Sequence, residues 1–344
     1  MAPPPLPPPE LDPWDFHLPD EAIADHPPAD RDGGRLMHLV GPATHHRQVR
    51  DLSELLRPGD LLVANDSAVR RARLVARRRP TGGQVELLFV GVDGPRGRAL
   101  LRPSRRLSAG SVLEAQGLRL RLETDPQDGQ ADIVADGDLD LHLAQHGEVP
   151  LPPYLARKAT HADAERYQTT YARVLGSAAA PTAGLHLSMP LRARLADRGV
   201  AFATVTLHVG LGTFKPLTAE ALAEGALHPE RFTVLPEAAA ACSEARSRGG
   251  RIVAVGTTTV RALHTAQGPD GRIRAMDGTT RLFLRPPDRT SAVDGLLTNF
   301  HLPRSSLLML VSTFVGRERL LSAYREALAT GYRFASYGDA MLIL

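Results

Sequence analysis

Cysteine is almost absent from this sequence. Cys242 is the only cysteine among 344 residues, so no disulfide can form within the chain and no cluster of thiolates can bind a metal. The sequence also lacks HExxH and the cysteine and histidine spacings that are typical of metal sites, and we expect no bound metal. This composition suits a reducing compartment, so we expect a cytoplasmic protein.

Long hydrophobic runs are also missing. The longest strongly apolar stretch, residues 307–311, is far too short to cross a bilayer, so we expect no membrane segment. The first nine residues are mostly proline and lack the basic start and apolar stretch of a secretion signal. They predict a disordered, proline-rich tail over residues 1–12.

The remaining sequence predicts two structural units. Between residues 58 and 153, short apolar stretches separated by turn residues are typical of a small antiparallel barrel, and the alternation over Leu118–Leu122 is its clearest strand. After Pro153, helices alternate with strands, and residues 51–56 form a further helical segment. Because 344 residues exceed the usual size of one domain, we expect an α/β fold in two parts. The predicted parts are a mixed α/β body over 13–64 and 150–344 and an antiparallel β-barrel domain inserted over 65–149.

Two glycine-containing turns follow predicted strands. The stretch 206–214 reads TLHVGLGTF, and glycine there indicates either a bulge or strand exit, or close approach of a ligand to the main chain. The turn 256–259, Gly-Thr-Thr-Thr, lies between a strand and a helix, where unpaired N–H groups favour an anion. For this turn the alternative is that Thr257 simply caps the helix.

Histidines and carboxylates beside such turns are candidates for proton transfer. His186, His208 and His301 lie next to glycine, threonine or asparagine at the edge of apolar segments, where imidazole can transfer protons or bind a ligand. Each is also compatible with a structural histidine. The same holds for turn carboxylates, which often bond to their own backbone. Those considered are Asp66, Glu86 and Asp339.

Arginine is clustered although the net charge is only +3. Six arginines fall within ten residues, and a second group follows at residues 102–106. Such a run can neutralise the phosphates of a nucleic acid, or it can be a solvated surface. The first group is Arg70, Arg71, Arg73, Arg77, Arg78 and Arg79.

Nine motifs follow one another along the chain and cover essentially the whole sequence after the proline-rich tail. They are PGDLLVAND (58–66), TGGQVE (81–86), PLPPY (150–154), ERYQ (165–168), APTAGLH (180–186), TLHVGLGTF (206–214), VGTT (255–258), LTNFHLP (297–303) and YGDAM (337–341). Taken together, these motifs resemble those of the S-adenosylmethionine:tRNA ribosyltransferase-isomerases of the queuosine pathway.

The resemblance implies an α/β body with an inserted barrel and a specific reaction. The ribosyl part of S-adenosylmethionine moves to 7-aminomethyl-7-deazaguanine at the wobble position of tRNA, methionine and adenine leave, and epoxyqueuosine forms. S-adenosylmethionine is then a consumed co-substrate, with no other cofactor and no metal, and we expect a monomer that acts on tRNA.

The resemblance also suggests roles for individual residues. A sulfonium acidifies the neighbouring C5′ hydrogens, so we expect proton transfer by His186 and His208, with Asp339 as a further base. The six arginines at 70–79 are expected to contact the tRNA backbone. The expected substrate-binding residues are Asn65, Asp66, Thr81, Gly82, Gly83, Glu86, Tyr167, Gln168, Thr182, Gly184, Gly210, Gly212, Thr213, Phe214, Gly256, Thr257, Thr258, Asn299, His301 and Tyr337.

Three positions depart from the family pattern. Ala68 replaces the usual arginine, His228 is the single histidine where two are usual, and Ala335 replaces a phenylalanine. These differences leave open a paralogue that uses S-adenosylmethionine with a free nucleobase or a small amine as acceptor. A noncatalytic RNA-binding protein is a third alternative, which the histidine, threonine and glycine turns disfavour.

Overall fold

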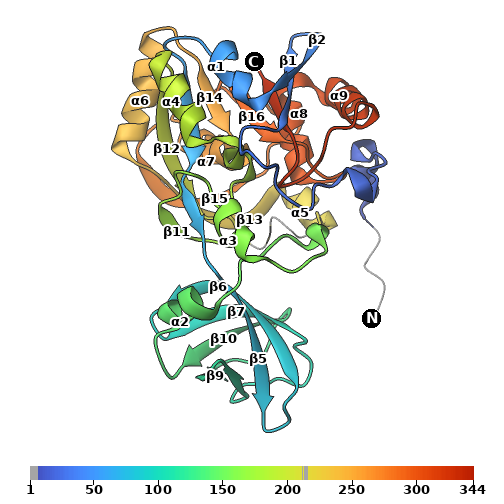
Figure 1. Cartoon of the computed structure of the whole chain (residues 1–344), viewed down its shortest axis with the longest axis vertical. Coiled ribbons are helices and arrows are strands. Elements are labelled where there is room, and N and C mark those ends of the chain that lie inside the picture. Colours follow the sequence, from blue (N-terminus) through green and yellow to red (C-terminus); the bar gives the residue numbers. More distant parts are fainter. Residues whose placement is uncertain (1–6, 211, 213–215) are drawn as a thin grey trace.

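The computed structural model describes residues 7–210, 212 and 216–344. In this part of the chain, one large mixed sheet forms the body and a closed barrel forms a second lobe (Figure 1). In order across the sheet, its strands are β15 Met276–Leu282, β13 Ala226–Val234, β12 Ala201–Leu207, β3 Leu61–Asn65, β14 Ile252–Val255, β16 Gly295–Asn299, β17 Ala340–Ile343, β1 Arg35–Val40 and β2 Ala43–Gln48.

Helices cover both faces of this sheet because its central strands are apolar on both sides. In β3, Leu61 and Val63 face the larger core, to which α6, α7, α8 and α9 contribute, whereas Leu62 and Ala64 face the core shared with α1 and α4. Successive side chains of a strand point to opposite faces, so an uninterrupted apolar run is buried on both faces of the sheet. The helices are α1 Leu52–Leu55, α2 Leu139–His146, α3 His161–Arg166, α4 Met189–Asp197, α5 Ala219–Glu224, α6 Pro236–Ser247, α7 Thr257–Thr265, α8 Ser306–Val315 and α9 Arg317–Ala329.

The body sheet brings several strand ends to one edge. Strands β12, β3, β14 and β16 are parallel neighbours, so their carboxyl ends meet. Strand β17 runs antiparallel to β16, and β1 runs parallel to β17, so both begin at this edge. We call it the strand-end edge: it carries the residues that follow β12, β3, β14 and β16 and those that precede β17 and β1. In open α/β sheets the carboxyl ends of parallel strands are the usual place for a ligand.

The second lobe is a closed antiparallel barrel. Inward-facing residues such as Leu74, Leu87, Leu101 and Leu120 form its separate core. Figure 1 shows the barrel and α2 as a lobe beside the body. The barrel order is β10 Gln130–Ala135, β7 Arg96–Arg102, β6 Gln84–Asp93, β5 Arg73–Arg79, β8 Val112–Ala115 and β9 Leu118–Leu122.

The chain enters and leaves the barrel at one place. The amide of Arg73 donates to the carbonyl of Glu148 (3.1 Å), and the amide of Glu148 donates to the carbonyl of Arg73 (2.8 Å). Beside this bridge, Gly147 packs against Arg71: a Cβ on Gly147 would lie 1.9 Å from the carbonyl oxygen of Arg71. The two crossings are therefore hydrogen-bonded to each other.

Short elements complete the chain. Strands β4 Ser67–Val69 and β11 Val174–Ser177 form a small parallel pair next to the strand-end edge. The 3-10 helices are η1 Pro9–Trp14, η2 Asp20–Ala22, η3 Val49–Asp51, η4 Pro153–Leu155 and η5 Thr182–His186.

The fold class predicted from the sequence is confirmed, with three local differences. The stretch 61–63, which the sequence pattern groups with the barrel strands, is part of β3 in the body sheet. The sequence marks β5 only as an arginine cluster, although Leu74 and Ala76 point into the barrel. Residues 7–12 belong to the predicted disordered tail, but η1 begins at Pro9 because Leu11 is buried in the main core; residues 1–6 lie outside the described residues.

No helix among the residues described is both long and apolar enough to span a membrane.

Candidate active site at the strand-end edge

Asn65, the last residue of β3, ties three elements together at the strand-end edge. Its Nδ2 donates to the carbonyl of Leu207 (2.9 Å), and its Oδ1 accepts from the amide of Leu207 (3.0 Å). Nδ2 also donates to Oγ1 of Thr258 in the first turn of α7 (3.2 Å). Asn65 is fully buried, so these bonds fix the end of β12 relative to β3 and α7.

Asp66 follows with a buried carboxylate whose two oxygens have different partners. Oδ1 accepts from the hydroxyl of Thr206 (2.7 Å), and Oδ2 pairs with Nη2 of Arg173 (2.9 Å). Beside it, Ser177 Oγ donates to Ser67 Oγ (2.8 Å) and accepts from the amide of Val209 (2.9 Å). This buried network joins β4, β11 and the end of β12 next to His208.

His208 is half-buried and its ring lies against β11. A Cβ on Gly176 would be 2.9 Å from both Nδ1 and Cε1 of His208, so only glycine allows this contact. Nδ1 is buried and has no hydrogen-bond partner among the described residues. Burial lowers the pKa of His208, as does Arg231, and nearby Asp66 opposes this. The ring is therefore mostly neutral near pH 7, with one nitrogen unused.

His186, at the end of η5, meets Asn299 and Asp339 across the same edge. Nδ2 of Asn299 lies 3.1 Å from Nε2 of His186 and donates to the carbonyl of Ala335 (3.2 Å). The contact with Ala335 fixes the amide with its nitrogen toward the ring, so Nε2 of His186 must accept. Burial lowers the pKa of His186 to about 4, so at pH 7 the neutral ring carries its proton on Nδ1. A Cβ on Gly34 would contact both this Nδ1 and Oδ1 of Asp339 (3.7 and 3.5 Å), which places the two side chains side by side.

Both carboxylate oxygens of Asp339 bind the backbone. Oδ1 accepts from the amide of Arg35 (2.7 Å) and Oδ2 from the amide of Arg333 (2.8 Å). Burial raises the pKa of Asp339, and these bonds counteract part of the shift. Asp339 therefore holds the starts of β17 and β1 together, which favours an orienting role over that of a free base.

Five further predicted residues lie in the elements that meet at or near this edge. Gly256, with φ of +89°, is the N-cap of α7, and Thr257 is the first helical residue, so the alternative in which Thr257 caps the helix does not hold. Thr182 begins η5, and a Cβ on Gly184 would lie 2.1 Å from the hydroxyl of Tyr171. His301 lies in the core, where Nε2 is 2.9 Å from Oγ1 of Thr298 and burial lowers its pKa to about 4.

Tyr167 and Tyr337 belong to a separate buried cluster, and the half-buried Gln168 follows Tyr167 in the chain. The hydroxyl of Tyr337 donates to Asp163 (2.7 Å), and Tyr167 packs edge-on against Tyr337. Gln168 bonds through both its side-chain oxygen and nitrogen to the backbone of Val69 (3.0 and 2.9 Å). These contacts are structural, and the structure places the aromatic rings in a core.

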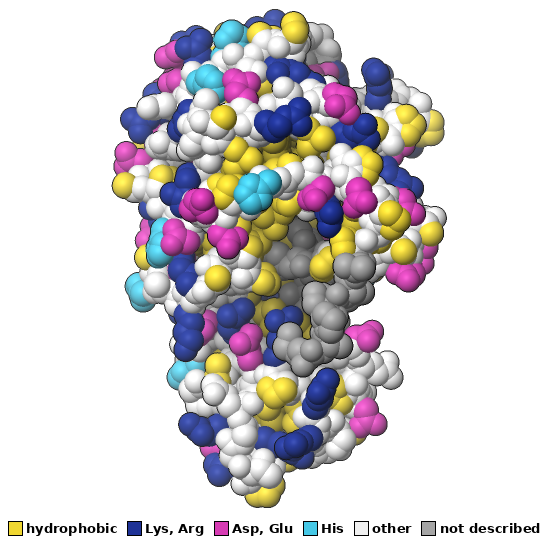
Figure 2. Space-filling model, turned by 90° about the vertical axis from the view of Figure 1, so that its right-hand side faces the viewer, with side chains coloured by type: hydrophobic (Ala, Val, Ile, Leu, Met, Phe, Trp, Pro, Cys, Tyr) yellow, Lys and Arg dark blue, Asp and Glu magenta, His cyan; other side chains and the backbone are white. Residues whose placement is uncertain are grey.

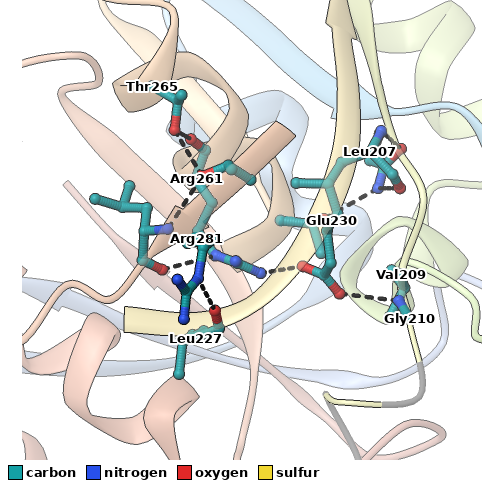
Figure 3. Close-up of polar contacts among 12 residues, drawn as sticks. Leu207, Val209, Gly210, Leu227, Glu230, Arg261, Thr265 and Arg281 are labelled. Carbon is teal, nitrogen blue, oxygen red and sulfur yellow. Dashed lines mark hydrogen bonds and ion pairs between the residues drawn. The ribbon is translucent and has the colours of Figure 1, made fainter. Parts of the chain in front are cut away.

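The glycines of TLHVGLGTF have different surroundings. A Cβ on Gly212 would lie 2.5 Å from Cδ2 of His228, so that ring excludes any side chain there. The amide of Gly210 donates to Oε1 of Glu230 (2.9 Å), whose other oxygen pairs with Arg261 (Figure 3). Close contacts within the protein thus explain in part why glycine occupies these positions. The predicted site residues Thr213 and Phe214 lie outside the described residues.

The barrel residues of the prediction are not brought to the strand-end edge. Strand β5 starts at the bridge to Glu148, so the turn with Thr81, Gly82 and Gly83 lies at the opposite end of a seven-residue strand, roughly 20 Å away. Glu86 lies on β6, 3.4 Å from Arg73. These four residues lie on the outside of the barrel.

The arginines predicted to bind tRNA differ in their exposure and in whether their guanidinium groups already have a partner. Arg70 pairs with Asp140 of α2, and burial lowers its pKa. Arg79 pairs with Glu114 (2.5 Å), and Arg73 with Glu86. Arg71, although exposed, donates to the carbonyl of Ala144 (3.1 Å). Arg77 is also exposed and Arg78 half-buried. Arginine side chains are visible across the barrel lobe in Figure 2.

Sequence reasoning missed two features of this region. Gly176 and Ser177 on β11 gave no motif, although they support His208 and Val209. The buried pair of Glu230 and Arg261 joins residues 31 positions apart, and only the lone charge in an otherwise apolar helix turn around Arg261 could have indicated it. Among the residues that the structure describes, no group of three or more metal-binding side chains is present.

Fold and site together define a class: a mixed α/β enzyme with imidazoles and amides at its strand ends and an arginine-bearing barrel attached to the body. The family described as "Queuosine biosynthesis protein" matches residues 11–343, and the chain belongs to this family.

Named relatives resemble the chain over their full lengths. An S-adenosylmethionine:tRNA ribosyltransferase-isomerase from Anaeromyxobacter dehalogenans is 50% identical over 97% of this chain and 99% of its own. That from Thermus thermophilus is 49% identical with the same coverage. The crystal structure of an S-adenosylmethionine tRNA ribosyltransferase from Thermotoga maritima, 36% identical, matches with a TM-score of 0.56 over 97% of this chain and 100% of that one.

Proposed function

We propose that this protein transfers and isomerises the ribosyl part of S-adenosylmethionine onto 7-aminomethyl-7-deazaguanine in tRNA, giving epoxyqueuosine with release of adenine and methionine. The observation that carries the proposal is identity of about one half, along nearly the whole chain, to relatives named for this transferase-isomerase activity. Action on tRNA places the reaction in the cytoplasm.

His208 is the strongest candidate for the base that removes a C5′ proton. Its lowered pKa keeps the ring neutral near pH 7, so one ring nitrogen has a lone pair that can accept a proton. The contact with Gly176 sets the position of the ring, and the network of Asp66, Thr206 and Ser177 sets the strand that carries it.

His186 is better suited to donate a hydrogen bond than to accept a proton. Asn299 occupies Nε2, and the remaining Nδ1–H group lies beside Asp339 at the same edge. We assign His186 to polarising the ribose or the leaving adenine through Nδ1–H. Asp339 orients this part of the edge through its bonds to Arg35 and Arg333.

The arginines of the barrel are assigned to the tRNA backbone. Arg77 and Arg78 have no acidic partner within 4 Å among the described residues, and they lie toward the end of β5 that is remote from the body. Contacts to phosphate position a nucleic acid without reading its sequence, so a barrel that sits beside the strand-end edge can hold the tRNA while the wobble base enters.

Adenine release tests the proposal. Purified protein is incubated with S-adenosylmethionine and tRNA carrying 7-aminomethyl-7-deazaguanine, and both adenine and the mass of the modified nucleoside are measured. We expect adenine and a product of epoxyqueuosine mass only when this tRNA is present. Turnover with a small free amine and not with tRNA would overturn the assignment of the acceptor.

A further inference from the structure

A cavity of about 260 Å³ lies next to the end of β12. Its lining includes the exposed His228, Glu220 and Glu224 and the first residue of α8, Ser306. The buried guanidinium of Arg261 also lines it. Cavities that hold a complete small molecule usually exceed about 300 Å³, so this one suits a single arm of a larger ligand.

Arg261 is only 5% exposed, yet one of its nitrogens has no partner in the described part of the chain. Nε donates to the carbonyl of Leu282 (3.1 Å), and Nη1 pairs with Glu230 (Figure 3). Nη2 is buried and makes no hydrogen bond to any described residue. A buried charged donor without an acceptor costs several kcal/mol in general, so such a group is expected to meet a ligand.

The second arginine of the cavity differs in this respect. Arg281 is more than half exposed, donates to Glu224 (2.7 Å) and reaches the carbonyl of Leu227 (3.2 Å). The guanidinium of Arg281 is therefore already paired. The donor in the cavity lining that still needs an acceptor is Nη2 of Arg261.

The chemistry of the lining selects the ligand. Nη2 of Arg261 and the N-terminal end of α8 at Ser306 both favour a carboxylate, whereas the carboxylate of Glu220 favours an ammonium group nearby. A zwitterionic α-amino acid end satisfies both requirements at once.

Residues that line the cavity are linked by hydrogen bonds and by helix α7 to residues of the strand-end edge. Glu230, the partner of Arg261, accepts from the amide of Gly210, two residues after His208. On α7, Thr258 bonds to Asn65 at the edge and Arg261 follows one turn later on the same side of the helix. A ligand arm in the cavity can therefore belong to a molecule whose reacting end lies beside His208.

We propose that this cavity binds the methionine end of S-adenosylmethionine, with Nη2 of Arg261 as the donor to its α-carboxylate. This inference rests on the proposed function, because it concerns the co-substrate of that reaction. The bound carboxylate would place the sulfonium toward the end of β12, where the imidazole of His208 lies.

The first test uses the unmodified protein. Isothermal titration calorimetry compares S-adenosylmethionine with its decarboxylated form, S-adenosyl-3-methylthiopropylamine, which keeps the sulfonium, the adenosine and the amine. We expect the decarboxylated form to bind about 10 to 100 times more weakly, as for loss of a charge-assisted hydrogen bond. Binding of the two within about threefold of each other would overturn the inference and leave the proposed function intact.

Variants assign the effect to Arg261. In the double variant Glu230→Gln and Arg261→Gln, two amides replace the buried ion pair, so neither of these two residues is left as a buried charge without the other. We expect this variant to bind both ligands within about threefold of each other, whereas the control Arg281→Gln keeps the wild-type ratio. A ratio that survives in the double variant overturns the role of Arg261, and if that variant does not fold, the wild-type comparison still decides.

Two other outcomes can be told apart from those described above. Absence of any binding of S-adenosylmethionine by the wild-type protein would overturn the proposed function and the inference with it. Equal binding of the two ligands, combined with a loss of tRNA affinity in the double variant, would indicate that Arg261 binds a phosphate and would overturn the inference.

Discussion

Gly176 lies directly against the imidazole of His208. A Cβ on Gly176 would lie 2.9 Å from two ring atoms, and φ of Gly176 is +148°, where other residues are strained. In the Gly176→Ala variant we expect the ring to shift and kcat/KM for adenine release to fall by about tenfold or more. The matched control is Gly91→Ala on β6, where a Cβ meets no atom within 4 Å. Unchanged activity of Gly176→Ala would contradict the position assigned to His208.

The pH dependence of the reaction separates the two histidines at the edge. If His208 is the base, the acid limb of the kcat/KM profile should have its midpoint below 6.5, because burial lowers the pKa of His208. This limb should persist in His186→Gln, which retains a hydrogen-bond donor, and kcat should fall about 10²- to 10⁴-fold in His208→Gln. A limb that disappears in His186→Gln instead would reverse the two roles.

His301 should make the protein less stable in acid. Its pKa is about 4 in the fold and about 6.5 in an unfolded chain, so between these values the unfolded state binds more protons and the free energy of unfolding falls as pH falls. From about pH 7 to about pH 4.5 this loss is roughly 2.4 kcal/mol. In His301→Gln, which can still bond to Thr298, the loss should shrink by about that amount in urea titrations at the two pH values. The exposed His17 provides the control variant His17→Gln.

Asp163 should be one of the most sensitive carboxylates for stability. Its side chain is 2% exposed and pairs with Arg157 (2.7 Å), while Thr160 and Tyr337 donate to it as well. Asp163→Asn leaves the guanidinium without its charge partner, and we expect a loss of about 3 to 5 kcal/mol in the free energy of unfolding. The half-exposed pair of Arg98 and Asp132 (3.9 Å) offers the comparison: Asp132→Asn should cost less than about 1 kcal/mol. Equal losses in the two variants would contradict this account.

The affinity for tRNA and its dependence on salt concentration should both change when Arg77 or Arg78 is replaced. Each contact to phosphate that is lost lowers the slope of log K against log salt by about 1, so Arg77→Gln and Arg78→Gln should weaken binding at low salt and flatten the slope. The control is Arg325→Gln, an exposed arginine on α9 in the body. Fluorescence anisotropy from about 50 to about 200 mM salt measures both quantities, and slopes that do not differ from the control would remove these residues from the interface.

The sequence was sufficient for elements whose signal is local. Helix α4 buries Leu191 and Leu195, which are four residues apart on one helical face, and is followed by Gly199, while Ser305 caps α8 by accepting from the amide of Leu308. The alternation over Leu118–Leu122 forms β9, with Leu118, Leu120 and Leu122 facing the barrel core. These features depend on residues within one or two turns of each other.

The parts that the sequence could not predict depend on distant partners. Nothing near Glu230 signals Arg261, and nothing near Gly176 signals His208, because each pair is joined only when β12 and its neighbours align. The same applies to His186, whose tautomer follows from Asn299, more than a hundred residues away. The motifs indicated candidate site residues. Only the fold shows which of these side chains already have a partner within the protein.

The bridge between Arg73 and Glu148 has a consequence for how such a protein can change. Because the barrel starts and ends at hydrogen-bonded neighbours, the body sheet would close in the same way around a short turn in its place. The barrel is therefore a replaceable module: its size and surface can be altered in evolution or by design without moving a strand of the body. If the barrel holds the acceptor and the body the sulfonium, as proposed, the two recognition tasks are free to diverge at separate rates.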